Sequence, residues 1–165
     1  METGRADRYN PAMSSGALGS VVRIGLIAGT LDIAENLIFN AFRHITPAMI
    51  FRYIASGLTG RWAFEAGVAS ILLGVAIHYT IALFWTALYW TASGRMAVLE
   101  QRPVASGLVY GGLVYAIMNY AVLPLTRVPH SRVAATLASR VSGVLALLFC
   151  IGLTVALLTA RARRG

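Results

Sequence analysis

The chain has 165 residues, of which 58% are hydrophobic and 12% are charged, and its net charge is +8. Ordinary soluble domains have about 45–50% apolar and 25% charged residues, so this composition argues against a soluble protein and favours a membrane protein. Every basic residue is an arginine, and the arginines are scattered singly between apolar runs instead of being gathered on one face. This distribution excludes nucleic acid from the expected partners and is typical of flanks that face anionic headgroups.

The hydropathy pattern predicts a polar tail over residues 1–20, one membrane domain over residues 21–160 and a basic tail over residues 161–165. Each predicted span is close to the ~20 residues that an α-helix needs to cross a bilayer. The runs are too long and continuous for the strands of a β-barrel. The four spans are expected at about 21–42, 66–90, 104–123 and 141–158.

Aromatic residues flank the second predicted span, with Trp62 and Phe64 before it and Trp85, Tyr89 and Trp90 at its end. Such a distribution is typical of the aromatic belts that anchor a span at both membrane surfaces. We therefore predict that these side chains are interfacial anchors.

Prolines mark where several predicted helices begin or end. Pro103 opens the third span and Pro124 ends it. In the first connection, residues 47–57 begin with Pro47 and predict a short helix on the membrane surface. Residues 129–139 of the third connection have a similar pattern. The expected fold is therefore an all-α, integral membrane four-helix bundle with short amphipathic surface helices in the first and third connections.

Small residues recur inside the spans, where they allow neighbouring helices to approach closely. Gly25-Leu26-x-x-Gly29 resembles Gly107-Leu108-x-x-Gly111, which hints at an internal duplication about an axis along the membrane normal. The glycines that we assign to helix packing are Gly25, Gly29, Gly67, Gly74, Gly107, Gly111 and Gly112.

Two acids, Asp32 and Glu35, lie within the first span. A charge at the centre of a bilayer costs about 2.5–3.5 kcal/mol on insertion scales, so such groups need compensation. At about 100° per residue, Asn36 shares the face of these acids. His78 is the polar residue near the centre of the second span, and Tyr115 and Asn119 align on the third.

We expect these six residues to form one buried cluster that binds a proton, a cation or a small polar ligand. Two carboxyls one helical turn apart in a low dielectric should not both ionise freely, so a shared proton or a His78 cation would compensate them. An isolated polar residue in a span often serves only to hold helices together, at about 0.6 kcal/mol on average in one measured case. For His78 and Asn119 taken singly, that structural role is the simpler interpretation.

No metal or other cofactor is predicted. Asp32, Glu35 and His78 have the chemistry of a carboxylate–histidine site, but the paired ligand spacing of such sites is absent. A bis-histidine haem would require His44 or His130, which lie in connections. No nucleophile or phosphate-loop motif occurs, so no catalytic residue is assigned, and an intramembrane enzyme acting on lipid is only a third interpretation.

Several motifs also occur together: Gly29-Thr30-Leu31-Asp32, then Ala63-Phe64-x-x-Gly67 with Leu73-Gly74 and His78-Tyr79, then Met118-Asn119-Tyr120-x-Val122-x-Pro124-Leu125. This set resembles an uncharacterised family of small four-helix bacterial inner-membrane proteins over roughly residues 25–125. The resemblance implies no known activity. It places Asp32, His78 and Asn119 at positions of the family pattern, whereas Glu35 lies outside it.

Two functions follow from the sequence. The first is a small transporter or sensor that uses the polar cluster, and the second is a non-catalytic accessory subunit or assembly factor of a larger membrane complex. The bilayer is one partner, and a second copy of the chain or another membrane protein is the expected other. The arginines of residues 161–164 favour a cytoplasmic location for both termini of a protein of the bacterial inner (plasma) membrane.

Overall fold

The computed structural model describes residues 15–129 and 136–164. These residues are helical, with no strand among them, and four of their helices are long and apolar enough to cross a membrane. The four are Gly16–Ala41, Val68–Ser93, Pro103–Leu125 and Leu137–Arg164. The predicted helical class and the four apolar spans are therefore confirmed, and the chain has the helices of a multi-pass membrane protein.

The first half contains α1 (Ser15–Ala41), α2 (Pro47–Thr59), α3 (Trp62–Glu65) and α4 (Val68–Ser93). The polar residues 15–20, predicted to belong to a tail, form the first turns of α1, and residues 1–14 lie outside the described chain. Thr46 caps α2, because its hydroxyl accepts a hydrogen bond from the Met49 N–H at 3.3 Å. Gly67 turns the chain into α4 with a φ of +61°, which a residue with a Cβ rarely adopts.

The second half begins with α5 (Ala97–Gln101) and α6 (Pro103–Ile117), and α6 continues through the π-helix η1 (Met118–Val122) into α7 (Leu123–Leu125). The last long helix consists of α8 (Leu137–Leu145), the π-helix η2 (Ala146–Leu153) and α9 (Thr154–Arg164). Pro124 lies inside α7, although we predict it to end the third span. The helix is widened to a π turn just before this proline, which has no N–H to donate.

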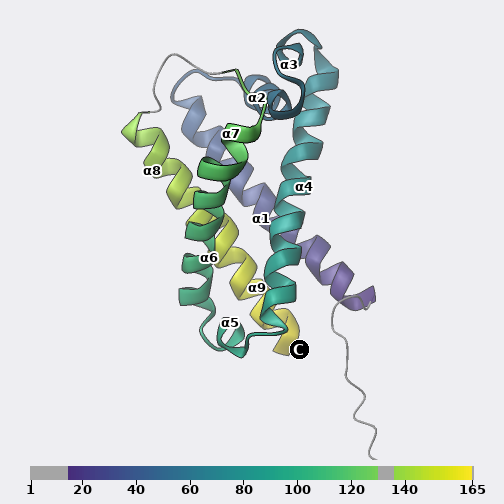
Figure 1. The fold of residues 1–165 in the computed structure, drawn as a ribbon, viewed down its shortest axis with the longest axis vertical. Helices are drawn as coiled ribbons and strands as arrows, with labels where there is room; N and C mark the ends of the chain where they lie inside the picture. Colours follow the sequence, from purple (N-terminus) through teal and green to yellow (C-terminus); the bar gives the residue numbers. More distant parts are fainter. Residues whose placement is uncertain (1–14, 130–135, 165) are drawn as a thin grey trace, which may run out of the picture.

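α1 is the helix around which the others are arranged: it packs against α4 and also against α8, η2 and α9. α6 packs on η2 and α9, and α2 packs on α4. In Figure 1, α1 runs obliquely from the end that holds α5 and the C-terminus toward the end that holds α2 and α7. Both ends of the described chain therefore lie at the same end of the molecule.

The structure has a separate short helix in only one of the two connections for which we predict a surface helix. The first connection contains α2, which packs on α4 with Ile50, Ala55 and Ser56 buried. The prediction for the third connection is wrong from Leu137 onward, because residues 137–139 already belong to α8 and continue into the fourth long helix. Thr136 caps this helix by accepting a hydrogen bond from the Ser139 N–H at 3.2 Å, which fixes its start. Residues 130–135 lie outside the described chain.

Glycines lie where the helices approach most closely. A Cβ on Gly25 would lie 2.7 Å from Leu83 Cδ2 of α4, and one on Gly29 would lie 2.9 Å from Ala82 Cβ. Without these side chains the α1 and α4 backbones can approach, which is the usual way in which membrane helices associate. A Cβ on Gly74 would overlap the backbone of Phe51, so α2 crosses α4 at this residue.

α6 and the fourth long helix also make a close contact. A Cβ on Gly107 would lie 2.9 Å from Ala156 Cβ, and one on Gly111 would lie 2.7 Å from Leu148 Cα. Gly67 and Gly112 differ from the other five glycines assigned to packing. A Cβ on Gly67 would meet nothing within 4 Å, and one on Gly112 would meet only Leu148 Cδ2, at 3.9 Å.

The aromatic residues at the end of α4 are part of the core, so their prediction as interfacial anchors is wrong. Trp85, Tyr89 and Trp90 are only 5%, 1% and 7% exposed. The Tyr110 hydroxyl donates to the Trp85 carbonyl at 2.6 Å, and the Tyr89 hydroxyl donates to the Leu99 carbonyl at 3.2 Å. These bonds connect α4 to α5 and α6, and they satisfy the hydroxyls of Tyr89 and Tyr110, whereas the indole N–H groups of Trp85 and Trp90 have no hydrogen-bond partner within the described chain.

The predicted basic tail is helical through Arg164, and two of its arginines, Arg163 and Arg164, bind other parts of the chain. Arg163 donates to the Trp90 carbonyl at 2.7 Å and lies over the Trp90 ring at 4.4 Å. Its Nε also lies 3.4 Å from Glu100 Oε1. Arg164 donates to the Glu100 carbonyl at 2.6 Å. These contacts join α9 to α4 and α5 at the end of the molecule that holds the C-terminus.

We predict that Gly111→Ala destabilises the protein by about 1–3 kcal/mol, because the new methyl group would overpack the contact between α6 and η2. Gly112→Ala is the matched control: it adds the same methyl group where there is room, and it should be neutral or slightly stabilising in a helix. Unfolding in detergent, followed by circular dichroism, measures the difference. Equal stability of the two variants would contradict this account of the contact.

Candidate functional site

The crossing of α1 and α4 brings two polar side chains of α4 onto the α1 backbone. His78 Nε2 donates to the Gly29 carbonyl at 2.8 Å, and the hydroxyls of Tyr79 and Thr30 share a hydrogen bond of 3.0 Å. A Cβ on Gly29 would lie only 3.2 Å from Tyr79 Cδ1, so a larger residue would push α4 away from this carbonyl. The glycine is therefore what allows the histidine to reach α1.

The bond to Gly29 fixes the position of the His78 ring. A carbonyl oxygen only accepts hydrogen bonds, so Nε2 must carry a proton. Within the described chain Nδ1 has no hydrogen-bond partner. Nδ1 is therefore the ring nitrogen that remains available for a further contact, while Nε2 holds the ring in place.

Asp32 lies nearly one turn beyond Gly29 on α1 and is partly buried. Its carboxylate is close enough to His78 and to Glu35 to interact with both electrostatically. No hydrogen bond or ion pair within the described residues involves the Asp32 side chain. Its oxygens are therefore free to bind a proton, water or a cation.

Glu35 is held by the last long helix. The Ser142 hydroxyl of α8 donates to Glu35 Oε1 at 2.5 Å, and this bond joins two residues 107 positions apart in the sequence. A hydrogen bond of this kind to a charged oxygen is stronger than one between neutral groups. α1 thus has its two acids in different surroundings: Glu35 is bonded to α8, whereas Asp32 has no hydrogen-bond partner in the described chain.

The other predicted members of the cluster are less closely connected. Tyr115 lies beside α8, since a Cβ on Gly143 would be 3.7 Å from its ring. Asn119 donates to the Tyr115 carbonyl of its own helix at 3.0 Å, and Asn36 is exposed and accepts from Asn40. Asp32 interacts electrostatically with both Glu35 and His78, and these three residues are here called the acid–histidine site. The structure does not join Asn36 or Asn119 to that site.

Three residues of the site region are not among the predicted site residues. Ser142 is a small polar residue next to Gly143 near the start of the fourth apolar run, and its pairing with Glu35 could not be seen from spacing within one helix. Thr30 directly follows Gly29 and Tyr79 directly follows His78 in the sequence. A polar residue beside each of these positions is the sequence feature that could have indicated their hydrogen bond.

Carboxylates and an imidazole are side chains that can in general exchange protons or bind cations. Within residues 15–129 and 136–164, no group of three or more His, Cys, Asp or Glu side chains has the arrangement of a metal site. No family model matches this chain, and no curated protein and no solved structure is significantly similar to it.

We predict a favourable coupling of about 1 kcal/mol between Glu35 and Ser142, in the range found for hydrogen bonds between membrane helices. The measurement is a double-mutant cycle of Glu35→Ala, which removes the acceptor, and Ser142→Ala, with unfolding followed in detergent. Ser139→Ala is the matched control, since the Ser139 hydroxyl bonds only the Thr136 carbonyl three residues earlier in the same segment. Additive effects of Glu35→Ala and Ser142→Ala would show that the bond does not contribute.

Proposed function

We propose that the protein is a small membrane transporter or sensor in which the acid–histidine site binds and releases a proton or a cation. The observation that carries this proposal is the state of Asp32: a carboxylate inside a span, without a hydrogen-bond donor in the described chain, next to a histidine with one free nitrogen. Ionisable groups in membrane spans are costly, and they mark ion pathways and proton relays in many membrane proteins.

The division between the two acids supports a relay more than a structural role. A polar residue stabilises the association of two helices when a donor and an acceptor are in contact, as in the hydrogen bond between Ser142 and Glu35. Asp32 has no such contact among the described residues and therefore adds cost without holding helices together. A proton shared between Asp32 and Nδ1 of His78, directly or through water, would remove that cost.

The proposed setting is the bacterial inner membrane, with the four spans as a bundle, α2 on its surface and both termini in the cytoplasm. The C-terminal arginines support this orientation. A bundle of four spans is small for a pathway of its own, so we propose that a second copy completes any route across the membrane.

We predict that Asp32→Asn reduces proton or cation flux at least tenfold in proteoliposomes, because the amide cannot take up or release a proton. Flux should be measured with a pH-sensitive dye between pH 5 and 8, where histidine titrates. Glu65→Gln is the matched control, since it makes the same carboxylate-to-amide change at an exposed residue outside the four spans.

Flux through Asp32→Asn equal to that of the wild type across this pH range would remove the relay proposal. A sensor without flux would still titrate, so infrared spectra of the carboxyl band should be recorded over the same range. A band that titrates in the wild type and in Glu65→Gln, but not in Asp32→Asn, supports the site in the absence of transport.

A second candidate, an accessory subunit of a larger complex, is favoured by the exposure of the third span. Only 11% of the most apolar stretch of Pro103–Leu125 is buried, against 28–33% in the other three spans. Val109 and Leu113 are 74% and 52% exposed. A helix so little covered by its own chain offers a face for a helix of another membrane protein.

For this candidate, we predict that a different membrane protein copurifies in stoichiometric amount after gentle solubilisation of native membranes. The double variant Val109→Trp and Leu113→Trp should reduce its yield at least tenfold by blocking the α6 face. Leu72→Trp, at a residue of α4 that is 64% exposed, is the control and should retain the partner. A pure homo-oligomer in mass spectrometry would argue against the accessory role.

A further inference from the structure

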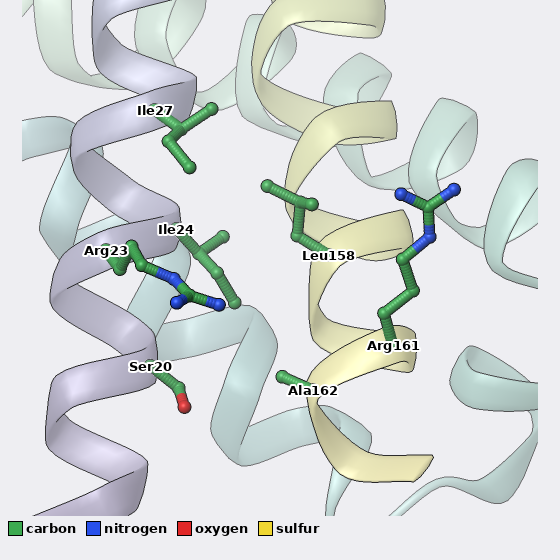
Figure 2. Close-up of a pocket in the computed structure, with 7 residues that line it drawn as sticks. All are labelled: Ser20, Arg23, Ile24, Ile27, Leu158, Arg161 and Ala162. Atoms are coloured by element: carbon green, nitrogen blue, oxygen red, sulfur yellow. The ribbon is translucent and has the colours of Figure 1, made fainter. Parts of the chain in front are cut away.

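A groove of about 410 Å³ lies between α1 and α9. It is at the end of the molecule that holds α5 and the C-terminus, since Arg161 is in the last turn of α9 (Figures 1 and 2). In Figure 2, Arg23 extends from α1 toward α9 and Leu158 points into the groove from α9. Arg161 borders the groove and its side chain continues along the other side of α9. The groove therefore combines a positive rim with an apolar wall.

The positive charges of this groove are not neutralised by the described part of the chain. Neither Arg23 nor Arg161 has a hydrogen-bond or ion-pair partner there. Glu100 is already bound by the neighbouring arginines, through its carboxylate to Arg163 and through its carbonyl to Arg164. Two arginines at the edge of a span thus remain available for an anion from outside the protein.

An apolar surface continues from the groove toward the middle of α1. A second, shallower hollow of about 300 Å³ is lined by Leu26, Ile27, Thr30 and Leu31, and it shares Ile27 with the groove. Leu31 is eight positions after Arg23, a rise of about 12 Å along the helix. A ligand that fits both hollows has a charged end at Arg23 and a hydrocarbon part beyond it.

We propose that the groove between α1 and α9 binds an anionic phospholipid, with its phosphate at Arg23 and one acyl chain along Ile27 and Leu31. The charge of the rim matches a headgroup phosphate, and basic pockets between spans bind anionic lipid headgroups in other membrane proteins. A free phosphate would leave the apolar hollow unused. This site uses neither Asp32 nor His78, so it does not depend on the proposed relay.

The test is native mass spectrometry of the full chain in detergent, titrated with phosphatidylglycerol or phosphatidylcholine of identical acyl chains. Wild-type protein should bind phosphatidylglycerol at least fivefold more tightly. Arg23→Gln should lose that preference, and Arg95→Gln, which removes an exposed arginine outside the groove, should keep it. Leu158→Trp retains both arginines but fills the apolar wall, and it should weaken binding to a similar extent.

Equal affinity for the two lipids, or equal losses in Arg23→Gln and Arg95→Gln, would overturn the proposal. Competition by inorganic phosphate as strong as that by phosphatidylglycerol would also overturn it, because the site would then recognise a free anion. Thermal unfolding in lipid-free detergent shows whether each variant is folded. If Arg23→Gln does not fold, the Leu158→Trp variant provides the test. Unchanged lipid binding by Leu158→Trp would reject the site.

Discussion

The close approach of α1 to α4 at Gly25 and Gly29 is the contact on which the rest of the structure depends. Lipid offers no hydrophobic force between helices, so membrane helices are held by packing and hydrogen bonds, and both need short distances. With no side chain at Gly29, Ala82 and Tyr79 pack on α1 and His78 reaches a backbone carbonyl. The two glycines thus hold the helices together and also bring a titratable ring to the acids of α1.

Beyond this crossing, α1 also contacts α8. The polar side chains of the molecule are bonded to several different kinds of partner. His78 uses a backbone carbonyl, Glu35 uses the Ser142 hydroxyl, and Arg163 uses the Trp90 carbonyl together with Glu100. In the described chain the partly buried Asp32 side chain has no hydrogen-bond partner. A buried polar group without a partner is expensive, so this difference is what separates Asp32 from groups that only stabilise the fold.

Some features could be predicted because a single helix determines them. The number of spans follows from hydropathy, since each must supply about 20 apolar residues to cross the bilayer. The start of α2 follows from Thr46 and Pro47, because capping and the fixed proline φ are local. Helical periodicity also places Gly25 and Gly29 on one face of α1, where α4 packs.

The neighbour of each face could not be predicted, because it depends on how the helices cross. Tyr89 and Trp90 have the sequence positions of belt aromatics, but Tyr89 bonds the Leu99 carbonyl and Trp90 packs under Arg163, so both rings are buried. Helical periodicity places Asn36 on the same face of α1 as Asp32, yet Asn36 is exposed and accepts a hydrogen bond from Asn40. The sequence by itself determined a helical chain with four membrane-length apolar runs and two acids inside the first, because length, hydropathy and periodicity are properties of one segment. Only the tertiary structure decided that Glu35 meets Ser142 and that Asp32 stays unpartnered within the described chain, because packing distances between segments far apart in the sequence select those contacts.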